Sequence, residues 1–214
     1  MSHPVWPLFD LRVVTPRLEL RAIDDDMGVA LAQLASRGIH DPGFMPFAVE
    51  WTDVQGDELL RNTMQYYWRC RADWSAASWS LNLAVVVDGE VVGTTGLMGQ
   101  HFPELRQFET GSWLGREFQG RGIGTEMRMA SLQLGFAGLD ARVATTVAFD
   151  DNPSSLGVTG KLGYVANGRS RRLRRGAPAT SLHFEMSRAH WEANVRRDDI
   201  TIHGLEGCLP LFGL

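Results

Sequence analysis

Residues 119–124 have the composition and spacing of a phosphate-binding loop. Their sequence, Gln-Gly-Arg-Gly-Ile-Gly, lies between an apolar, strand-like run over residues 110–114 and a long amphipathic segment. Glycine lets the backbone approach a ligand closely, and a helix that follows offers unpaired N–H groups and the positive end of its dipole. We therefore expect an anionic phosphate group to bind the following residues: Gln119, Gly120, Arg121, Gly122, Ile123, Gly124 and Thr125.

The motif alone leaves a second interpretation open, because a glycine-rich turn before a helix is also a common tight connection. The next segment favours a ligand loop, since its apolar residues recur at spacings of four and three and predict a helix held against a sheet. These residues are Ile123, Met127, Ala130, Leu134 and Ala137. The glycines do not follow G-x-G-x-x-G and no Gly-Lys-Ser/Thr is present, so dinucleotides and nucleoside triphosphates are disfavoured.

The loop fits Q/R-x-x-G-x-G/A at Gln119, Gly122 and Gly124, and so resembles the acyl-CoA pyrophosphate loop of the GNAT N-acyltransferase superfamily. Other segments resemble its ribosomal-protein N-terminal acetyltransferase (Rim-type) branch, and the motifs together cover roughly residues 12–190. These segments are residues 15–21, 109–114, 152–155 and 161–164. Residues 6–11 and the tail through 210–213 also resemble an actinobacterial subgroup in which succinyl-CoA can replace acetyl-CoA.

This resemblance implies an α/β (α+β) GNAT fold in one domain over residues 1–214, with short terminal extensions. The sheet would be mixed and mostly antiparallel, flanked by helices, with a central splayed strand pair formed by the strand before the loop and the next one, about 142–148. The pantetheine arm of acetyl-CoA, or of succinyl-CoA, would enter between those strands. Backbone groups near Trp113, Leu114 and Gly115 would bind it, and an N–H would polarise the thioester carbonyl.

Glu109 is the candidate general base. An amine must be neutral to attack a thioester, so an ammonium must first lose its proton to a base or an ordered water. Glu109 matches the Glu of the E-x-G-x-W-L strand, and alternation along a strand places it on the same face as Gly111 and Trp113. Trp113 itself is assigned to packing near the site. A surface or structurally paired carboxylate is the alternative for Glu109.

Asn152 and Ser155 are the candidates for the other side of the site. Asn152 before Pro153 is typical of a helix start, where Asn caps the helix and Pro occupies its first position. The resemblance implies that Asn152 and Ser155 contact pantetheine and that Ser155 protonates the leaving thiolate. Many GNAT enzymes use a Tyr acid at the position that Thr159 occupies here, so Ser155 or solvent remain as the proton donors.

Other segments predict the scaffold. Alternating apolar residues around Asp88-Gly89 predict an antiparallel hairpin with a primed turn over residues 81–97. Residues 24–26 supply a helix cap, and Thr52-x-x-Gln55 resembles a capping box before a second helix. These two helices would precede the main sheet.

The roles of two further segments, residues 169–175 and 44–51, each have two interpretations. The arginines of residues 169–175 form either a solvated hairpin, broken at Gly176-Ala177-Pro178, or a site for an anionic group such as the 3′-phosphate of CoA. The aromatic-rich residues 44–51 either gate the acceptor cleft or cover the core.

Composition argues against a nucleic-acid-binding, a membrane-spanning or a metal-binding protein. A formal net charge of −4 over 214 residues argues against general nucleic-acid binding, and no apolar stretch is long enough to span a membrane. Two cysteines and scattered histidines show no metal-ligand spacing, so no metal is expected, and the absence of a signal-like N-terminus favours the cytoplasm.

The acceptor would be an amine on a protein N-terminus, a lysine or a small molecule. Family resemblance also implies a homodimer or higher homo-oligomer. A non-catalytic acyl-CoA-binding sensor is the alternative from another functional class.

Overall fold

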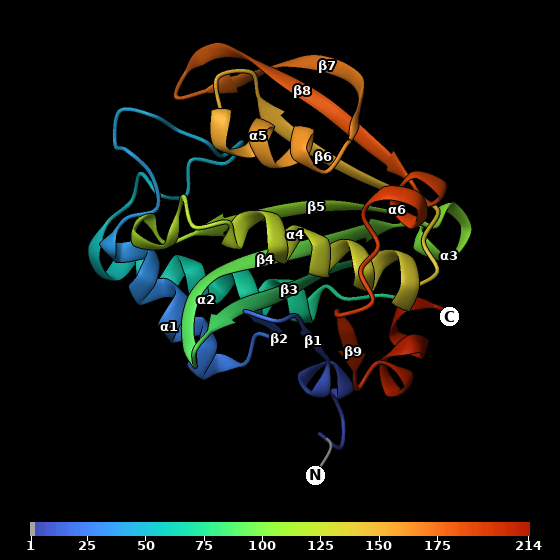
Figure 1. Ribbon diagram of the computed structural model, residues 1–214. Coiled ribbons are helices and arrows are strands. Elements are labelled where there is room, and N and C mark those ends of the chain that lie inside the picture. The colour runs from blue at the N-terminus through green and yellow to red at the C-terminus, as the bar shows by residue number, and fades with distance from the viewer. Residues whose placement is uncertain (1–2) are drawn as a thin grey trace.

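The protein is described by a computed structural model that covers residues 3–214, and in these residues one nine-stranded sheet has helices on both faces (Figure 1). The strands in chain order are β1 Arg12–Val14, β2 Glu19–Ala22, β3 Ser78–Val87, β4 Glu90–Gln100, β5 Gln107–Leu114, β6 Val143–Phe149, β7 Val165–Arg174, β8 Ala177–Ser187 and β9 Thr201–His203. Their order in the sheet is β7-β8-β6-β5-β4-β3-β2-β1-β9, and every pair is antiparallel except β5 with β6.

The helices are α1 Asp25–Arg37, α2 Gly56–Ala72, α3 Phe102–Leu105, α4 Ile123–Gln133, α5 Pro153–Lys161 and α6 Arg188–Asn194. Helices α1 and α2 cover one face of the sheet, and α4 crosses the other (Figure 1). Within the described residues, no helix is long and apolar enough to cross a membrane. This arrangement confirms the predicted mixed α/β fold.

Local signals in the sequence explain two of these elements. Asp24 caps α1, because its side chain accepts a hydrogen bond from the Met27 N–H at 2.8 Å. Asp88 and Gly89 both have positive φ, 50° and 83°, as a primed two-residue turn requires, and they join β3 to β4. The predicted cap and hairpin are therefore confirmed.

Strands β5 and β6 separate partway along their length, as the resemblance implied. They pair over Gln107↔Val143 to Thr110↔Thr146 only. Beyond that point β5 stays on β4 as far as Leu114, while β6 stays on β8 as far as Phe149. The neighbouring strands thus hold the two apart and leave a wedge-shaped gap between them, which we call the splay.

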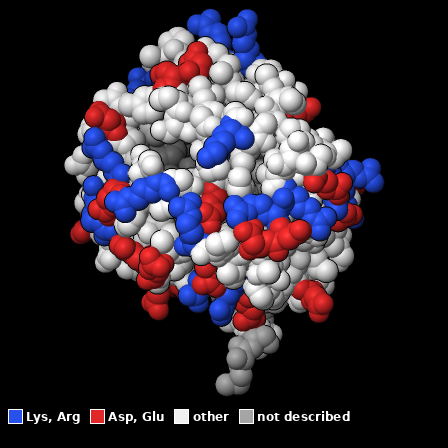
Figure 2. All heavy atoms as spheres, viewed as in Figure 1, with Lys and Arg blue, Asp and Glu red and all other residues white. Residues whose placement is uncertain are grey.

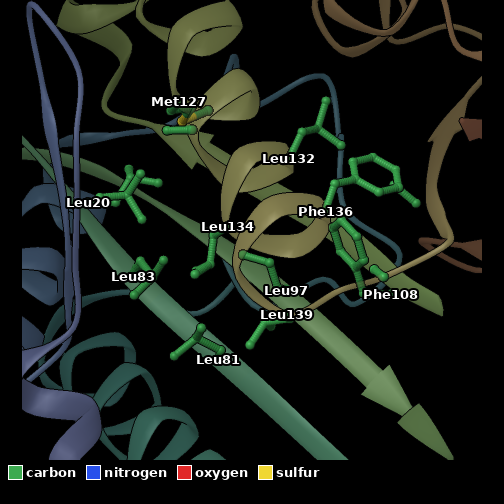
Figure 3. Packing of buried hydrophobic residues seen from close by; sticks show 14 of the residues in the cluster. Leu20, Leu81, Leu83, Leu97, Phe108, Met127, Leu132, Leu134, Phe136 and Leu139 are labelled. Atoms are coloured by element: carbon green, nitrogen blue, oxygen red, sulfur yellow. The ribbon is translucent and has the colours of Figure 1, made fainter. Parts of the chain in front are cut away.

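The main core lies between the sheet and α4 (Figure 3). Leu20, Leu83 and Leu97 project from the strands toward Met127 and Leu134, and each of the five side chains is at most 4% exposed. Burying a side chain of this size contributes roughly 1.5–3 kcal/mol. The core therefore fixes the orientation of α4, and with it the position of the glycine loop at its start.

Two local predictions were wrong. Ala137 is exposed, because the helix passes into a π turn over Leu134–Gly138 that breaks the 3.6-residue period. The capping box is absent, because Gln55 is itself the residue before α2 and its side chain makes no cap bond. The Thr52 hydroxyl is instead 2.7 Å from His40 Nε2, and this contact ties down the loop between α1 and α2.

Candidate active site

The glycine loop forms the N-terminus of α4. Gly120 and Gly122 have φ of 73° and 80°, a region that other residues rarely adopt, and Gly122 is the N-cap. The first backbone bond of the helix runs from the Glu126 N–H to the Gly122 carbonyl. The N–H groups of the three residues between them, 123–125, therefore have no intrahelical acceptor, and no side chain among the described residues caps this end. This end of α4 suits an anion such as a pyrophosphate.

The Gln119 side chain positions this loop. Its Nε2 donates to the Leu114 carbonyl at 2.9 Å and to the Ile39 carbonyl at 2.7 Å. Leu114 is the last residue of β5 and Ile39 lies just beyond α1. Gln119 was predicted as a binding residue on motif grounds, and in the structure its amide fixes where the loop starts.

A network on the first turn of α4 was missed by the sequence analysis. Glu126 is buried, and its carboxylate accepts hydrogen bonds from Thr15 Oγ1 at 2.6 Å and from Arg17 Nε at 2.6 Å. Arg17 also donates to the Arg121 carbonyl at 3.2 Å. Residues 15–21 were matched only to a family motif, yet Arg17 in this segment brings a cation to the glycine loop.

This network predicts a loss of stability in acid. Burial alone would raise the pKa of Glu126, but hydrogen bonds from Thr15 and Arg17 outweigh it and hold the pKa below the ordinary 4.5. The stabilisation is therefore present above that value and is lost as the pH falls through the lowered pKa. We expect Glu126→Gln to lower the free energy of unfolding at pH 7 by about 1–3 kcal/mol. The difference from wild type should shrink toward pH 3, as urea unfolding at several pH values would show.

Backbone donors at the end of β5 are fewer than the sequence suggested. The Gly115 N–H is taken up by the Val92 carbonyl of β4 at 3.0 Å, so it is not an available donor. Successive N–H groups of a strand point to opposite edges, so the Trp113 N–H also faces β4, whereas the Leu114 N–H faces the splay. Leu114 is accordingly the residue of the three whose N–H is available to a ligand in the splay.

Glu109 lies on β5 at the narrow end of the splay. It stands between Met98 of β4 and Thr145 of β6 in the register of the sheet, on the face opposite α4. The residue is exposed, and within residues 3–214 its side chain forms no hydrogen bond or ion pair. The position predicted from strand alternation is therefore the position found, whereas its chemical role stays a prediction.

Helix α5 forms the other wall of the site. Asn152 Oδ1 accepts from the Ser155 N–H at 3.1 Å, so the predicted cap is present. A Cβ atom added to Gly124 would lie 3.8 Å from Val158 Cγ2, so α5 packs beside the first turn of α4. Ser155 is half-buried and lies three residues before Val158, on the same side of α5. Thr159, at the position of the expected Tyr acid, is buried and its hydroxyl has no partner within the described part of the chain.

The loop over residues 38–55, which we call the strap, bridges the two sides of the splay. On the β5 side, the ring of Trp51 lies 5.8 Å from that of Trp113. On the far side, Arg175 binds both carboxylate oxygens of Asp53, at 2.9 and 2.5 Å. Arg174 donates to the Met45 carbonyl at 3.3 Å. The aromatic segment therefore covers the sheet and also closes one side of the site.

Two arginines of the β7–β8 hairpin, Arg174 and Arg175, form ion pairs. The turn of this hairpin is Arg175-Gly176, both with positive φ, whereas Ala177 and Pro178 belong to β8, so the predicted break was placed too late. Arg174 pairs with Asp151 at 2.6 Å and lies over the Phe149 ring. Hydrogen bonds from Arg174 and Arg175 lower the pKa of Asp151 and Asp53 respectively. These carboxylates are therefore charged at neutral pH.

The surface is hollowed between α5 and the beginning of α4, and Lys and Arg side chains lie on the rim of this hollow (Figure 2). We expect an anionic, elongated ligand to reach the splay through this hollow. Within residues 3–214, no group of three or more His, Cys, Asp or Glu side chains could hold a metal ion.

Comparison with known proteins agrees with this geometry. Residues 17–165 match the family model described as the acetyltransferase (GNAT) domain. The match covers most of the chain, so the protein belongs to the GNAT family of acetyltransferase enzymes. The predicted superfamily is thus confirmed.

Solved structures show the same fold. The ribosomal L7/L12 α-N-protein acetyltransferase RimL, in complex with coenzyme A, superposes with a TM-score of 0.65 at 18% identity and covers 81% of this chain and 96% of its own. A GNAT-family acetyltransferase from Bacillus anthracis gives 0.65 at 16% identity, covering 83% and 99%. An N-acetyltransferase from Brucella melitensis gives 0.66 at 18% identity, covering 85% and 80%.

Proposed function

We propose that the protein transfers an acyl group, in the simplest case acetyl, from its CoA thioester to a primary amine by direct attack. One observation carries this proposal: the free N–H groups at the start of α4 adjoin the splay between β5 and β6. A phosphate-binding end and a gap for an extended arm are therefore next to each other. The residues that would hold the donor are the loop 119–125, Leu114, Asn152 and Ser155.

The chemistry follows from the two faces of the sheet. Glu109, exposed on the face opposite α4, takes a proton from the acceptor ammonium directly or through a water. The neutral nitrogen then attacks the thioester carbonyl, and the Leu114 N–H stabilises the charge that develops on its oxygen. The C–S bond then breaks with its electron pair on sulfur, and the nitrogen releases its second proton to solvent as the amide forms. Ser155 or solvent supplies the proton that yields the free thiol.

A protein amine is the acceptor that the Rim-type motifs support, and the structural likeness to RimL is consistent with it. The strap leaves the acceptor to approach over the uncovered part of the sheet face that carries Glu109. Use of succinyl-CoA and assembly into a homo-oligomer stay predictions from the resemblance.

Thermal stabilisation by acetyl-CoA, succinyl-CoA and free CoA, measured in parallel, tests the donor site. At a ligand concentration of 100 Kd the expected gain is about 2.7 kcal/mol. Turnover with a panel of peptide and small-molecule amines then separates an enzyme from an acyl-CoA-binding sensor. The absence of binding by calorimetry for all three CoA species would refute the proposal.

A further inference from the structure

A buried arginine lies across the point where the two central strands part. Arg128, on α4, is only 5% exposed. Its Nη1 donates to Thr146 Oγ1 of β6 at 3.1 Å, and its Nη2 donates to Ser112 Oγ of β5 at 3.4 Å. Thr146 is the last β6 residue in register with β5, and Ser112 lies two residues beyond its partner Thr110. The guanidinium therefore spans the narrow end of the splay from the α4 side.

No other side chain in the described residues 3–214 neutralises the charge of Arg128. Within residues 3–214 it forms no ion pair with a carboxylate, and its Nε has no hydrogen-bond partner. Its two partners are neutral hydroxyls. Arg17, Arg174 and Arg175 all have carboxylate partners nearby. A buried and unneutralised charge is costly in a folded protein, so this residue stands out as prepared for an anion.

We propose that Arg128 binds negative charge at the reacting end of the acyl donor. The inference rests on the proposed function and adds a residue to its site. The charge has two possible sources: the oxygen and sulfur of the thioester during transfer, or a permanent carboxylate on the acyl chain. Both would place an anion in the splay beside the guanidinium.

The geometry suits this role. Arg128 reaches the splay from the α4 face, whereas Glu109 lies on the opposite face, so proton removal and anion stabilisation come from opposite sides of the sheet. Attack forms the C–N bond, moves the carbonyl π electrons to oxygen, and then expels the thiolate as the C=O bond reforms. A fixed cation stabilises both charges without donating a proton. This offsets the absence of an acidic side chain at Thr159.

The test compares Arg128→Met, Arg128→Lys and a control, Gln133→Leu, with the wild type. Gln133 is on the same helix, is 9% exposed, and also has an unpartnered buried atom, Oε1. The measurements are the dissociation constants of free CoA, acetyl-CoA and succinyl-CoA, the single-turnover rate with a reactive amine, and the melting temperature. Arg128→Gln provides a second neutral variant.

For Arg128→Met we expect unchanged affinity for free CoA and a melting temperature no lower than that of wild type. Loss of charge stabilisation on the thioester would slow single turnover of acetyl-CoA at least about tenfold without weakening its binding. Loss of a carboxylate partner would instead weaken succinyl-CoA binding at least about tenfold and leave acetyl-CoA binding unchanged. Arg128→Lys should recover part of either effect, and Gln133→Leu should show neither.

Two results would overturn the inference while leaving the proposed function standing. One is an Arg128→Met protein that keeps both its turnover and its affinity for succinyl-CoA. The other is a protein that loses melting temperature and free-CoA affinity together, as a purely structural arginine would. A wild-type protein that binds none of the CoA species would refute the proposed function and the inference together.

Discussion

Glu109→Gln is expected to lower the turnover number about 100-fold or more, because a positioned general base typically contributes 10²- to 10⁴-fold. Glutamine has nearly the same shape but cannot accept the proton of the acceptor ammonium. The side chain is exposed at the narrow end of the splay, away from the phosphate loop, so the dissociation constant of the acyl-CoA should not change. Steady-state kinetics from pH 5 to 10, with calorimetry for the donor, measures both quantities.

The dependence of the rate on pH tests the role of Glu109 more directly than the turnover number at one pH. In the wild type the acidic limb of the rate should report the deprotonation of the base, and in the variant this limb should disappear or move. Glu104→Gln is the matched control, since Glu104 is an exposed carboxylate on α3 outside the site. Unchanged turnover and an unchanged profile for Glu109→Gln would transfer the role to water.

Gly122→Asp is expected to weaken the binding of every CoA species at least about 100-fold. Two effects combine at this position. Aspartate is strained at a φ of 80°, at a cost of about 1 kcal/mol or more, and its carboxylate would repel the pyrophosphate from the start of α4. A loss of 2.7 kcal/mol corresponds to about a hundredfold in affinity.

A second glycine separates strain from charge. Gly89, in the turn between β3 and β4, has a φ of 83°, and a Cβ added there would meet no atom within 4 Å. Gly89→Asp therefore introduces the same residue under similar strain away from the loop, and it should lose stability while keeping its affinity for CoA. Equal affinities for Gly122→Asp and wild type, by calorimetry, would show that this helix end does not bind the donor.

The sequence predicted the elements of the site better than their surroundings. The glycine loop, the strand with Glu109 and the cap at Asn152 each carry a local signal, because turn, strand and cap preferences depend on neighbouring residues. The π turn after Gln133 and the exposed Ala137 carry none, because the period changes inside an apolar run.

The missed residues are those whose role depends on distant partners. Arg17 meets Glu126 across 109 positions of sequence, and Arg175 meets Asp53 across 122. In the sequence, Arg128 is one charged residue of an amphipathic helix, and nothing in its neighbours predicts that it is buried. Its burial follows only from the positions of the strands. The availability of the Leu114 N–H likewise follows from the strand pairing, which the residue type does not encode.

The length of the strap is also coupled to the length of the β7–β8 hairpin. Asp53 and Glu50 on the loop, and Arg175 at the tip of the β7–β8 hairpin, meet only because both segments have the length to reach across the site. A hairpin shortened by two residues would withdraw the guanidinium from Asp53 and the backbone N–H from Glu50, and would leave both carboxylates beside an aromatic cluster without these partners. An insertion or deletion in one segment thus requires a compensating change in the length of the other if the site is to stay enclosed.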